Sequence, residues 1–351
     1  IKQHLLSSLL LFLPVAAVSI YALIDKTLIG ALIRGQQYYP QGSIIIIVPI
    51  AQVENGYYFQ AEKIIKALLS ILLAVGTVMT SRNAIEYKNN RKGTIKKNIY
   101  RSFRFVFALG VPMALGTIIV AESFSTLYFG PNYSMYPQFP VDGVANLLIV
   151  YTPVIIFSGC SNILGSQYLL PIKKDKEYSI SVIIGFVCNL AFSALLIPTM
   201  GACGAIVGTI ISEFMIAFVQ YLYVSDDFSL RIILMNIWKY IMAGLVMFIV
   251  IYPLYVHVLK STTLGNIFNL AILIPSGVAL YYLVLLILRD HEIFRYTKRA
   301  LTGTGHFFKL AASKTTSFAM TIASTSHFND ITKREAVEYT NLKRKHRGKE
   351  K

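Results

Sequence analysis

The chain has 351 residues, of which 55% are hydrophobic and only 14% are charged, and its formal net charge is +16. Average soluble domains carry about 25% charged residues, so this composition excludes an ordinary soluble domain and predicts a polytopic membrane protein. The basic residues lie in blocks between apolar runs, as in the loops of membrane proteins, and we therefore expect no nucleic-acid partner.

The first apolar run, Leu5–Ile33, is long enough to span a bilayer, for which about 20 residues suffice. Its beginning resembles a signal peptide, but the run continues well past that point, so we favour a spanning helix. It carries no charge before Asp25 and Lys26. Charges inside a spanning segment are costly, which makes this pair a candidate for function.

Further apolar runs follow along the whole chain, and each is long enough to cross a bilayer with some tilt. We expect helices, because lipid requires every backbone group to be hydrogen-bonded within the protein. The predicted fold class is an all-α polytopic membrane protein with about eight transmembrane helices. The candidate spans are Leu5–Ile33, Tyr57–Thr80, Phe103–Ala121, Gly143–Leu170, Tyr178–Pro198, Gly201–Val224, Ile237–Val258 and Leu264–Arg289.

The connection between the first two spans has an unusual sequence. Residues 36–42 are polar, and Ser43–Ile50 then reads SIIIIVPI, which is too short to cross a bilayer. This pattern predicts a strand-like or re-entrant piece, for which the sequence offers no function.

Basic residues predict which connections face the cytoplasm. Eight of them lie between Arg82 and Arg104 against a single acid, Glu86, and predict a cytoplasmic loop. The part from Arg91 to Arg104 can dock on anionic lipid, although topology alone also explains its charge. An even number of spans places both termini in the cytoplasm, with the chain in the plasma membrane.

The remaining boundaries follow from composition. We predict a six-helix lobe over residues 1–224, two additional transmembrane helices over 225–290, and a basic, disordered cytoplasmic tail over 291–351. The three cysteines, Cys160, Cys188 and Cys203, lie singly in apolar runs, and the histidines show no metal-ligand spacing. We therefore expect no metal, no cofactor and no catalytic residues.

A charged hairpin forms the first candidate site. Asp25 and Lys26 lie near the outer end of the first span, and Glu62, Lys63 and Lys66 lie near the outer start of the second. Lys26 or Lys66 can pair with Glu62, and Asp25 can pair with Lys63; one assignment, Glu62–Lys66 with Asp25–Lys63, leaves Lys26 unpaired. The cationic excess suits an anionic substrate, while the alternative is neutralisation at the membrane interface.

A second candidate site lies near the middle of the bilayer. Asn189 and Glu213 are each eleven residues from the inner end of their span, so we expect them to meet at one depth. A carboxyl there must be protonated, hydrogen-bonded or bound to a cation, which makes the pair a candidate for ion coupling or a packing contact. Gly204 and Gly208 have the small-residue spacing that permits close helix approach.

Several motifs together resemble Wzx-type polysaccharide flippases of the multidrug/oligosaccharidyl-lipid/polysaccharide exporter superfamily. The resemblance covers about Leu5 to Arg289. It rests on Asp25–Gly30, Glu54–Tyr58, Ala61–Ile64, Gly76–Met79, Phe129-Gly130 with Tyr133, Ser166-Gln167 before Leu170-Pro171, and Gly201–Glu213.

The resemblance implies a MATE-like exporter fold of two six-helix lobes, of which this chain would form the second lobe plus two extra helices. It further implies alternating-access flipping of undecaprenyl-diphosphate-linked oligosaccharide, driven by an ion gradient, with membrane lipids around it. Ile1 would then precede the seventh helix, and the missing N-terminal lobe or a partner chain would complete the transporter. The alternatives are a multidrug exporter of the same superfamily and a membrane polysaccharide polymerase or ligase.

Overall fold

A computed structural model describes residues 23–41, 44–130, 143–259 and 266–289. Within this part, seven helical segments are long and apolar enough to span a membrane. The protein is therefore a multi-pass membrane protein, as its composition predicts. The helices are α2 (Ile50–Lys88), α3 (Lys92–Phe129), α4 (Val144–Tyr151), α5 (Pro153–Ser161), the π-helix η2 (Asn162–Leu169), α6 (Asp175–Met200), α7 (Ala202–Val224), α8 (Leu230–Leu254), the π-helix η3 (Tyr255–Leu259) and α9 (Asn266–Ile287).

The first predicted span is described only at its end, where residues 23–32 are helical. The rest of that span and the predicted tail lie outside the described residues. The division at residue 224 into a lobe and two additional helices stays a prediction.

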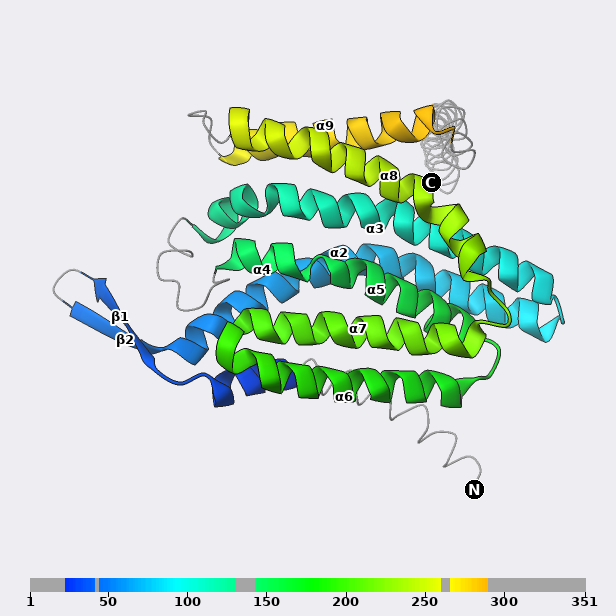
Figure 1. The fold of residues 1–351 in the computed structure, drawn as a ribbon, viewed down its shortest axis with the longest axis horizontal. Coiled ribbons are helices and arrows are strands. Elements are labelled where there is room, and N and C mark those ends of the chain that lie inside the picture. The colour runs from blue at the N-terminus through cyan, green and yellow to red at the C-terminus, as the bar shows by residue number, and fades with distance from the viewer. Residues whose placement is uncertain (1–22, 42–43, 131–142, 260–265, 290–351) are drawn as a thin grey trace, which may run out of the picture. The chain divides into compact units, whose positions relative to one another are not determined.

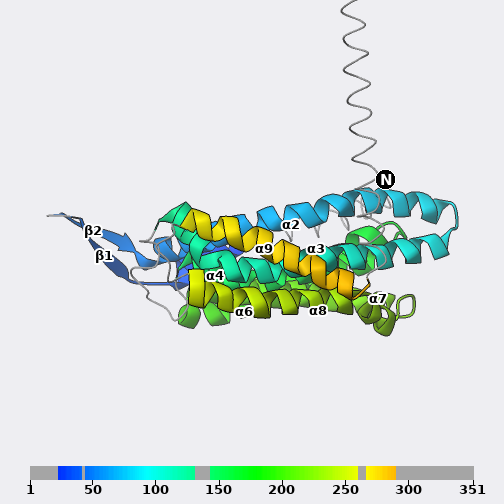
Figure 2. The same cartoon turned by 90° about the horizontal axis from the view of Figure 1, so that it is seen from above.

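Strands β1 (Gln36–Gln41) and β2 (Ile44–Pro49) form an antiparallel hairpin before α2, with register from Gln36↔Pro49 to Gln41↔Ile44. These strands confirm the strand-like interpretation of this segment. The physical reason is that β-branched residues favour an extended backbone. Gly35, at a φ of 120°, turns the chain into β1. The hairpin extends beyond the helices at one end in both Figure 1 and Figure 2.

The prediction of a long basic loop between the second and third spans is wrong. Helix α2 continues to Lys88 and α3 begins at Lys92. Asn90 adopts a left-handed φ of 55° and its N–H donates to the Tyr87 carbonyl, while the Arg91 N–H donates to the Glu86 carbonyl. These two bonds form a Schellman motif, which ends a helix within two residues. The basic residues therefore lie mainly on helical extensions.

Proline and small residues shape the other helices. Thr152 and Pro153 separate α4 from α5 within one span, Val144–Leu169, because proline removes a backbone donor. In Figure 1, α7 lies between α5 and α6, and α8 and α9 lie on the α3 side. A Cβ at Gly204 would lie 2.5 Å from the Leu196 carbonyl carbon, so this glycine permits the close α6–α7 packing that its spacing predicts.

Candidate functional site

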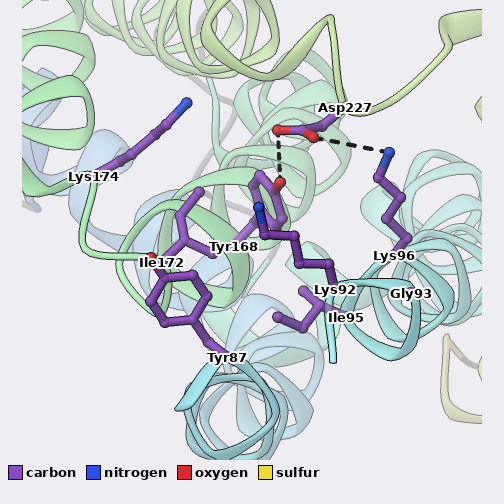
Figure 3. Close-up of a pocket in the computed structure, with 9 residues that line it drawn as sticks. All are labelled: Tyr87, Lys92, Gly93, Ile95, Lys96, Tyr168, Ile172, Lys174 and Asp227. Atoms are coloured by element: carbon purple, nitrogen blue, oxygen red, sulfur yellow. Dashed lines mark hydrogen bonds and ion pairs between the residues drawn. The ribbon is translucent and has the colours of Figure 1, made fainter. Parts of the chain in front are cut away.

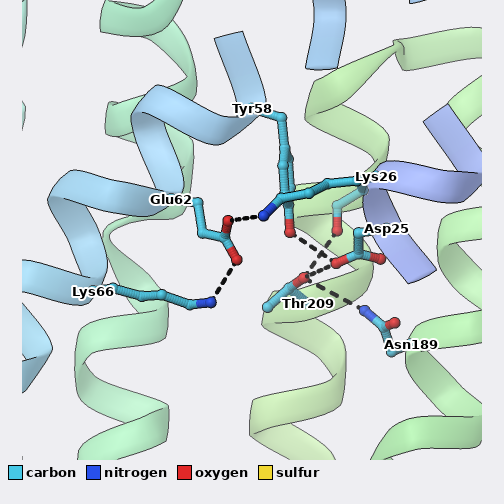
Figure 4. Close-up of polar contacts among 8 residues, drawn as sticks. Asp25, Lys26, Tyr58, Glu62, Lys66, Asn189 and Thr209 are labelled. Atoms are coloured by element: carbon cyan, nitrogen blue, oxygen red, sulfur yellow. Dashed lines mark hydrogen bonds and ion pairs between the residues drawn. The ribbon is translucent and has the colours of Figure 1, made fainter. Parts of the chain in front are cut away.

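The charged hairpin brings one buried carboxylate between two lysines. Glu62 on α2 is 4% exposed, and its two oxygens contact Lys66 Nζ at 2.6 Å and Lys26 Nζ at 2.8 Å. Lys26 also lies over the ring of Phe59, 5.0 Å from its centroid. Figure 4 shows both amines converging on this carboxylate. The predicted pairing of Glu62 with Lys26 or Lys66 is confirmed, and both pairs form together.

The expected pairing of Asp25 with Lys63 is wrong, and so is the inference that Lys26 stays unpaired. Lys63 is exposed on α2 and has no ion-pair partner in the described part of the chain. Its neighbours Glu62 and Lys66 are four residues apart on one helix face, whereas Lys63 lies about 100° around the helix from Glu62. The helix periodicity therefore turns Lys63 away from the cluster.

Asp25 lies in a separate cluster made of hydroxyl groups. Its Oδ2 accepts hydrogen bonds from Tyr58 Oη and Thr209 Oγ1, both at 2.9 Å, and its Oδ1 accepts one from Ser193 Oγ at 3.1 Å. Asp25 is 1% exposed, and no lysine or arginine among the described residues forms an ion pair with it. Its negative charge is stabilised by dipoles alone, so the site is suited to a proton or a small cation.

Helices α6 and α7 position two of these hydroxyls because glycine lets them approach closely. A Cβ on Gly208 would collide with Ser193 Oγ and lie 3.0 Å from the Ser193 backbone nitrogen. Thr209 is the next residue on α7, and its hydroxyl reaches the same carboxylate as Ser193, because both donate to Asp25. Small residues at a helix interface thus bring side chains from two helices to one carboxylate.

The second candidate site divides between two clusters. Asn189 is fully buried, and its Nδ2 donates to Thr209 Oγ1 at 3.4 Å, so it belongs to the Asp25 cluster. Glu213 accepts a hydrogen bond from Ser161 Oγ at 3.3 Å. The expected Asn189–Glu213 contact is therefore wrong. Ser193 lies one turn from Asn189, and Glu213 one turn from Thr209, so both helices present polar faces to the bundle.

Two residues of the Asp25 cluster, Ser193 and Thr209, escaped sequence reasoning, as did the role of Tyr58. Hydroxyl residues are common in membrane helices and bond to their own backbone, so their presence alone is a weak signal. The four-residue spacing of Asn189 and Ser193 on one face is a stronger signal that was available. Tyr58 also packs against Tyr151, with ring centroids 6.3 Å apart, which holds its hydroxyl in place.

A third carboxylate holds the start of α7. Glu54 on α2 is 2% exposed, and its Oε2 accepts a hydrogen bond of 2.7 Å from the Ala202 backbone nitrogen. Carboxylates are stabilised at helix N-termini by unpaired N–H groups and by the helix dipole. This contact fixes α7 against α2 and so fixes Thr209 relative to Tyr58.

The groups hydrogen-bonded to Asp25 from Tyr58, Ser193 and Thr209 are all hydroxyl oxygens. Carboxylate and hydroxyl oxygens are the groups that hard cations prefer. A proton on Asp25 would satisfy the same site by letting the carboxyl donate a hydrogen bond. Binding of a cation or of a proton would neutralise Asp25. This residue belongs to the first span and contacts α2, α6 and α7, so all four segments would experience the change in charge.

Similar proteins place the chain in a family. A family model described as lipid II flippase MurJ matches residues 50–276. Lipid II flippase MurJ of Bacillus subtilis (strain 168) is 24% identical over 148 residues, covering 42% of this chain and 26% of that relative. Capsular polysaccharide biosynthesis protein CapF of Staphylococcus aureus is 23% identical over 249 residues, covering 63% of this chain and 60% of CapF.

One solved structure shares the fold. The inward closed conformation of lipid II flippase MurJ matches with a TM-score of 0.55 and 19% sequence identity, over 68% of this chain and 48% of that one. The chain thus spans between about a quarter and three-fifths of the length of these relatives. This match supports the predicted fold class, an all-α polytopic membrane protein. Because the family model covers more than half of its residues, the chain belongs to the lipid II flippase MurJ family.

Proposed function

We propose that the protein containing this chain flips an undecaprenyl-diphosphate-linked oligosaccharide across the cell membrane by alternating access, for polysaccharide biosynthesis. Membership of the lipid II flippase MurJ family supports a lipid-linked substrate, and the likeness to a capsular polysaccharide biosynthesis protein supports a role in polysaccharide biosynthesis. The observation that carries the proposal is the pair of buried acid clusters around Asp25 and Glu62. Intramembrane charges of this kind mark substrate and ion pathways.

The Glu62 cluster is the proposed substrate contact. Two lysine amines share one carboxylate, which leaves a positive charge at Lys26 and Lys66 in a partly dehydrated place. A diphosphate would be attracted to this excess, and a cationic drug would be repelled. Lys63 lies on another face of α2, outside the Glu62 cluster, and adds only to the positive electrostatic potential of this region.

The Asp25 cluster is the proposed ion-coupling site. The carboxylate has no cationic partner among the described residues, so binding of a proton or a small cation would neutralise it in the low-dielectric interior. Asn189 belongs to this site through Thr209. Glu213 is a second titratable group one turn further along α7, and its role in coupling is the weaker alternative.

The orientation belongs to the same proposal. The positive-inside tendency supports a cytoplasmic location for the basic ends of α2 and α3, and we propose that both termini lie on the same side. A partner lobe, on this chain's own polypeptide or on another, would complete the central cavity between lobes. Membrane lipids surround the helices. We propose a non-catalytic transporter rather than a polymerase or ligase.

The test is the lipid-linked intermediate that accumulates when the gene for this protein is deleted. We expect an undecaprenyl-diphosphate-linked oligosaccharide to build up on the cytoplasmic leaflet, measured by lipid extraction and mass spectrometry. Accumulation of lipid II instead would assign the substrate to the peptidoglycan precursor. Unchanged pools of all undecaprenyl-linked intermediates, with altered drug susceptibility, would contradict the proposal and favour the multidrug exporter.

A further inference from the structure

A cavity of about 550 Å³ lies at the end of the bundle opposite the β-hairpin. Its lining includes Lys92 and Lys96 of α3, Lys174 at the start of α6, Tyr168 of η2 and Asp227 between α7 and α8. These residues come from four separate segments of the chain, and Figure 3 shows Lys96 and Tyr168 facing Asp227. The volume falls within the range of about 300–1,000 Å³ that is typical of small-molecule sites.

Two tight turns build the rim of this cavity. The Schellman motif at Asn90 brings Lys92 directly after the end of α2. A second Schellman motif follows η2, where Lys173 has a φ of 62°. The backbone N–H of Lys173 donates to the Leu170 carbonyl, and the backbone N–H of Lys174 donates to the Leu169 carbonyl. A left-handed conformation is uncommon for lysine, so the backbone at this rim is held by its hydrogen bonds.

An aromatic wall fixes the acidic side of the cavity. Tyr168 is 6% exposed, and its hydroxyl donates a 2.8 Å hydrogen bond to Asp227 Oδ2. The ring of Tyr168 packs edge-on against Phe228, with centroids 4.7 Å apart, and Phe228 is fully buried. The carboxylate of Asp227 is therefore held in one orientation, with its Oδ1 directed toward Lys96 at 3.8 Å.

The charges in the cavity do not balance. Three lysines and one carboxylate line the cavity, and Lys92 and Lys174 form no ion pair with any described residue. The Lys96–Asp227 ion pair is long and about half exposed, so it is weak, and both groups can still bind a ligand. Each carboxylate oxygen can accept two hydrogen bonds, so Asp227 can accept further donors. The cavity thus offers ammonium groups for an anion and a carboxylate for hydroxyl groups.

We propose that this cavity binds a phosphoester that also carries hydroxyl groups, as in the glycerophosphate headgroup of an anionic membrane lipid. Lysine ammonium groups bind phosphate oxygens as point charges, and Asp227 would accept a hydroxyl hydrogen from the same headgroup. Tyr168 and Asp227 lie at the ends of the spans Val144–Leu169 and Ala202–Val224, which is the level expected for lipid headgroups. A soluble phosphoester has the same chemistry and is distinguished by experiment.

Titration calorimetry of the purified chain in a nonionic detergent tests this site. The ligands are short-chain phosphatidylglycerol, glycerol phosphate, phosphatidic acid and phosphatidylcholine. We expect phosphatidylglycerol to bind more tightly than phosphatidic acid, which lacks headgroup hydroxyls, and more tightly than the zwitterionic phosphatidylcholine. Weaker binding of glycerol phosphate than of phosphatidylglycerol assigns the site to a lipid, and equal binding assigns it to a soluble phosphoester.

Two double variants separate the cavity from general surface charge. Lys92→Gln with Lys174→Gln removes two lining lysines and should weaken phosphatidylglycerol binding by about tenfold or more, since charge-assisted hydrogen bonds are lost. Lys97→Gln with Lys176→Gln removes equal charge from the same two helical regions outside the cavity and should change binding less than about twofold. Both proteins should keep the wild-type thermal midpoint, because all four lysines are at least partly exposed.

Several results would overturn the proposal. Equal weakening in both double variants would show only diffuse electrostatic attraction. Wild-type affinity in Lys92→Gln/Lys174→Gln would place the anion elsewhere. Phosphatidylcholine binding as tightly as phosphatidylglycerol would rule out the anion, and tighter phosphatidic acid binding would rule out recognition of hydroxyl groups by Asp227.

Discussion

Asp25 and Glu62 are two buried carboxylates in neighbouring segments, and the fold stabilises them in opposite ways. Glu62 has two lysines within 2.8 Å, both partly exposed to the surroundings. Asp25 has three hydroxyl donors and no ion pair among the described residues. The first arrangement is held by two salt bridges, whereas the second can gain or lose a cation without disrupting a salt bridge. Because the two carboxylates have different partners, we predict that they have different roles in transport.

The largest expected effect comes from removing the charge at Asp25. Asp25→Asn keeps the side-chain shape, and its one acceptor oxygen can still accept from Tyr58 and Thr209, so we expect a folded protein. Transport driven by an ion gradient should fall by at least about tenfold. The reason is that the neutral amide carries no negative charge to bind a proton or a small cation. Flipping of lipid-linked saccharide in vesicles, with and without a gradient, is the measurement.

Glu213→Gln serves as the matched comparison, since Glu213 lies one turn from Thr209 on α7 and is also buried. If Asp25 is the coupling group, Glu213→Gln should retain most of the gradient-driven rate. The opposite ranking, with Glu213→Gln inactive and Asp25→Asn active, would return the coupling role to Glu213.

The Glu62 cluster should show compensation between its lysines. Lys26→Met or Lys66→Met alone should lower the free energy of unfolding by about 1 kcal/mol or less, because the other lysine still neutralises Glu62. The double variant leaves a buried carboxylate unpaired and should cost about 3 kcal/mol or more. Thermal unfolding in detergent measures both. Additive single effects would mean that the two lysines act independently, and Lys63→Met provides a control that should change little.

A smaller effect should follow from closing the space between α6 and α7. Gly208→Ala places a methyl group against Ser193 and should cost about 1–3 kcal/mol of stability while moving Ser193 away from Asp25. Gly56→Ala in α2 meets no atom within 4 Å and should stabilise the helix by up to about 1 kcal/mol. Equal thermal midpoints for the two variants would show that the close approach at Gly208 has no energetic importance.

The sequence by itself determined the membrane class and most of the helices. Apolar runs such as Tyr57–Thr80 and Gly201–Val224 must form helices in lipid, because no other local structure satisfies their backbone. It also determined the Glu62–Lys66 pair, since both residues lie on one helix four positions apart. The strand character of residues 44–49 followed from their β-branched side chains.

Only the tertiary structure decided the helix ends beyond the bilayer and the partners of Asp25. Charged residues outside the lipid are compatible with either helix or loop, so the basic stretch before Phe103 gave no signal that α3 begins at Lys92. Ser193 and Thr209 lie 168 and 184 residues from Asp25 along the chain. Contacts over such separations depend on how α6 and α7 pack against the first span, and the close approach at Gly208 sets that packing.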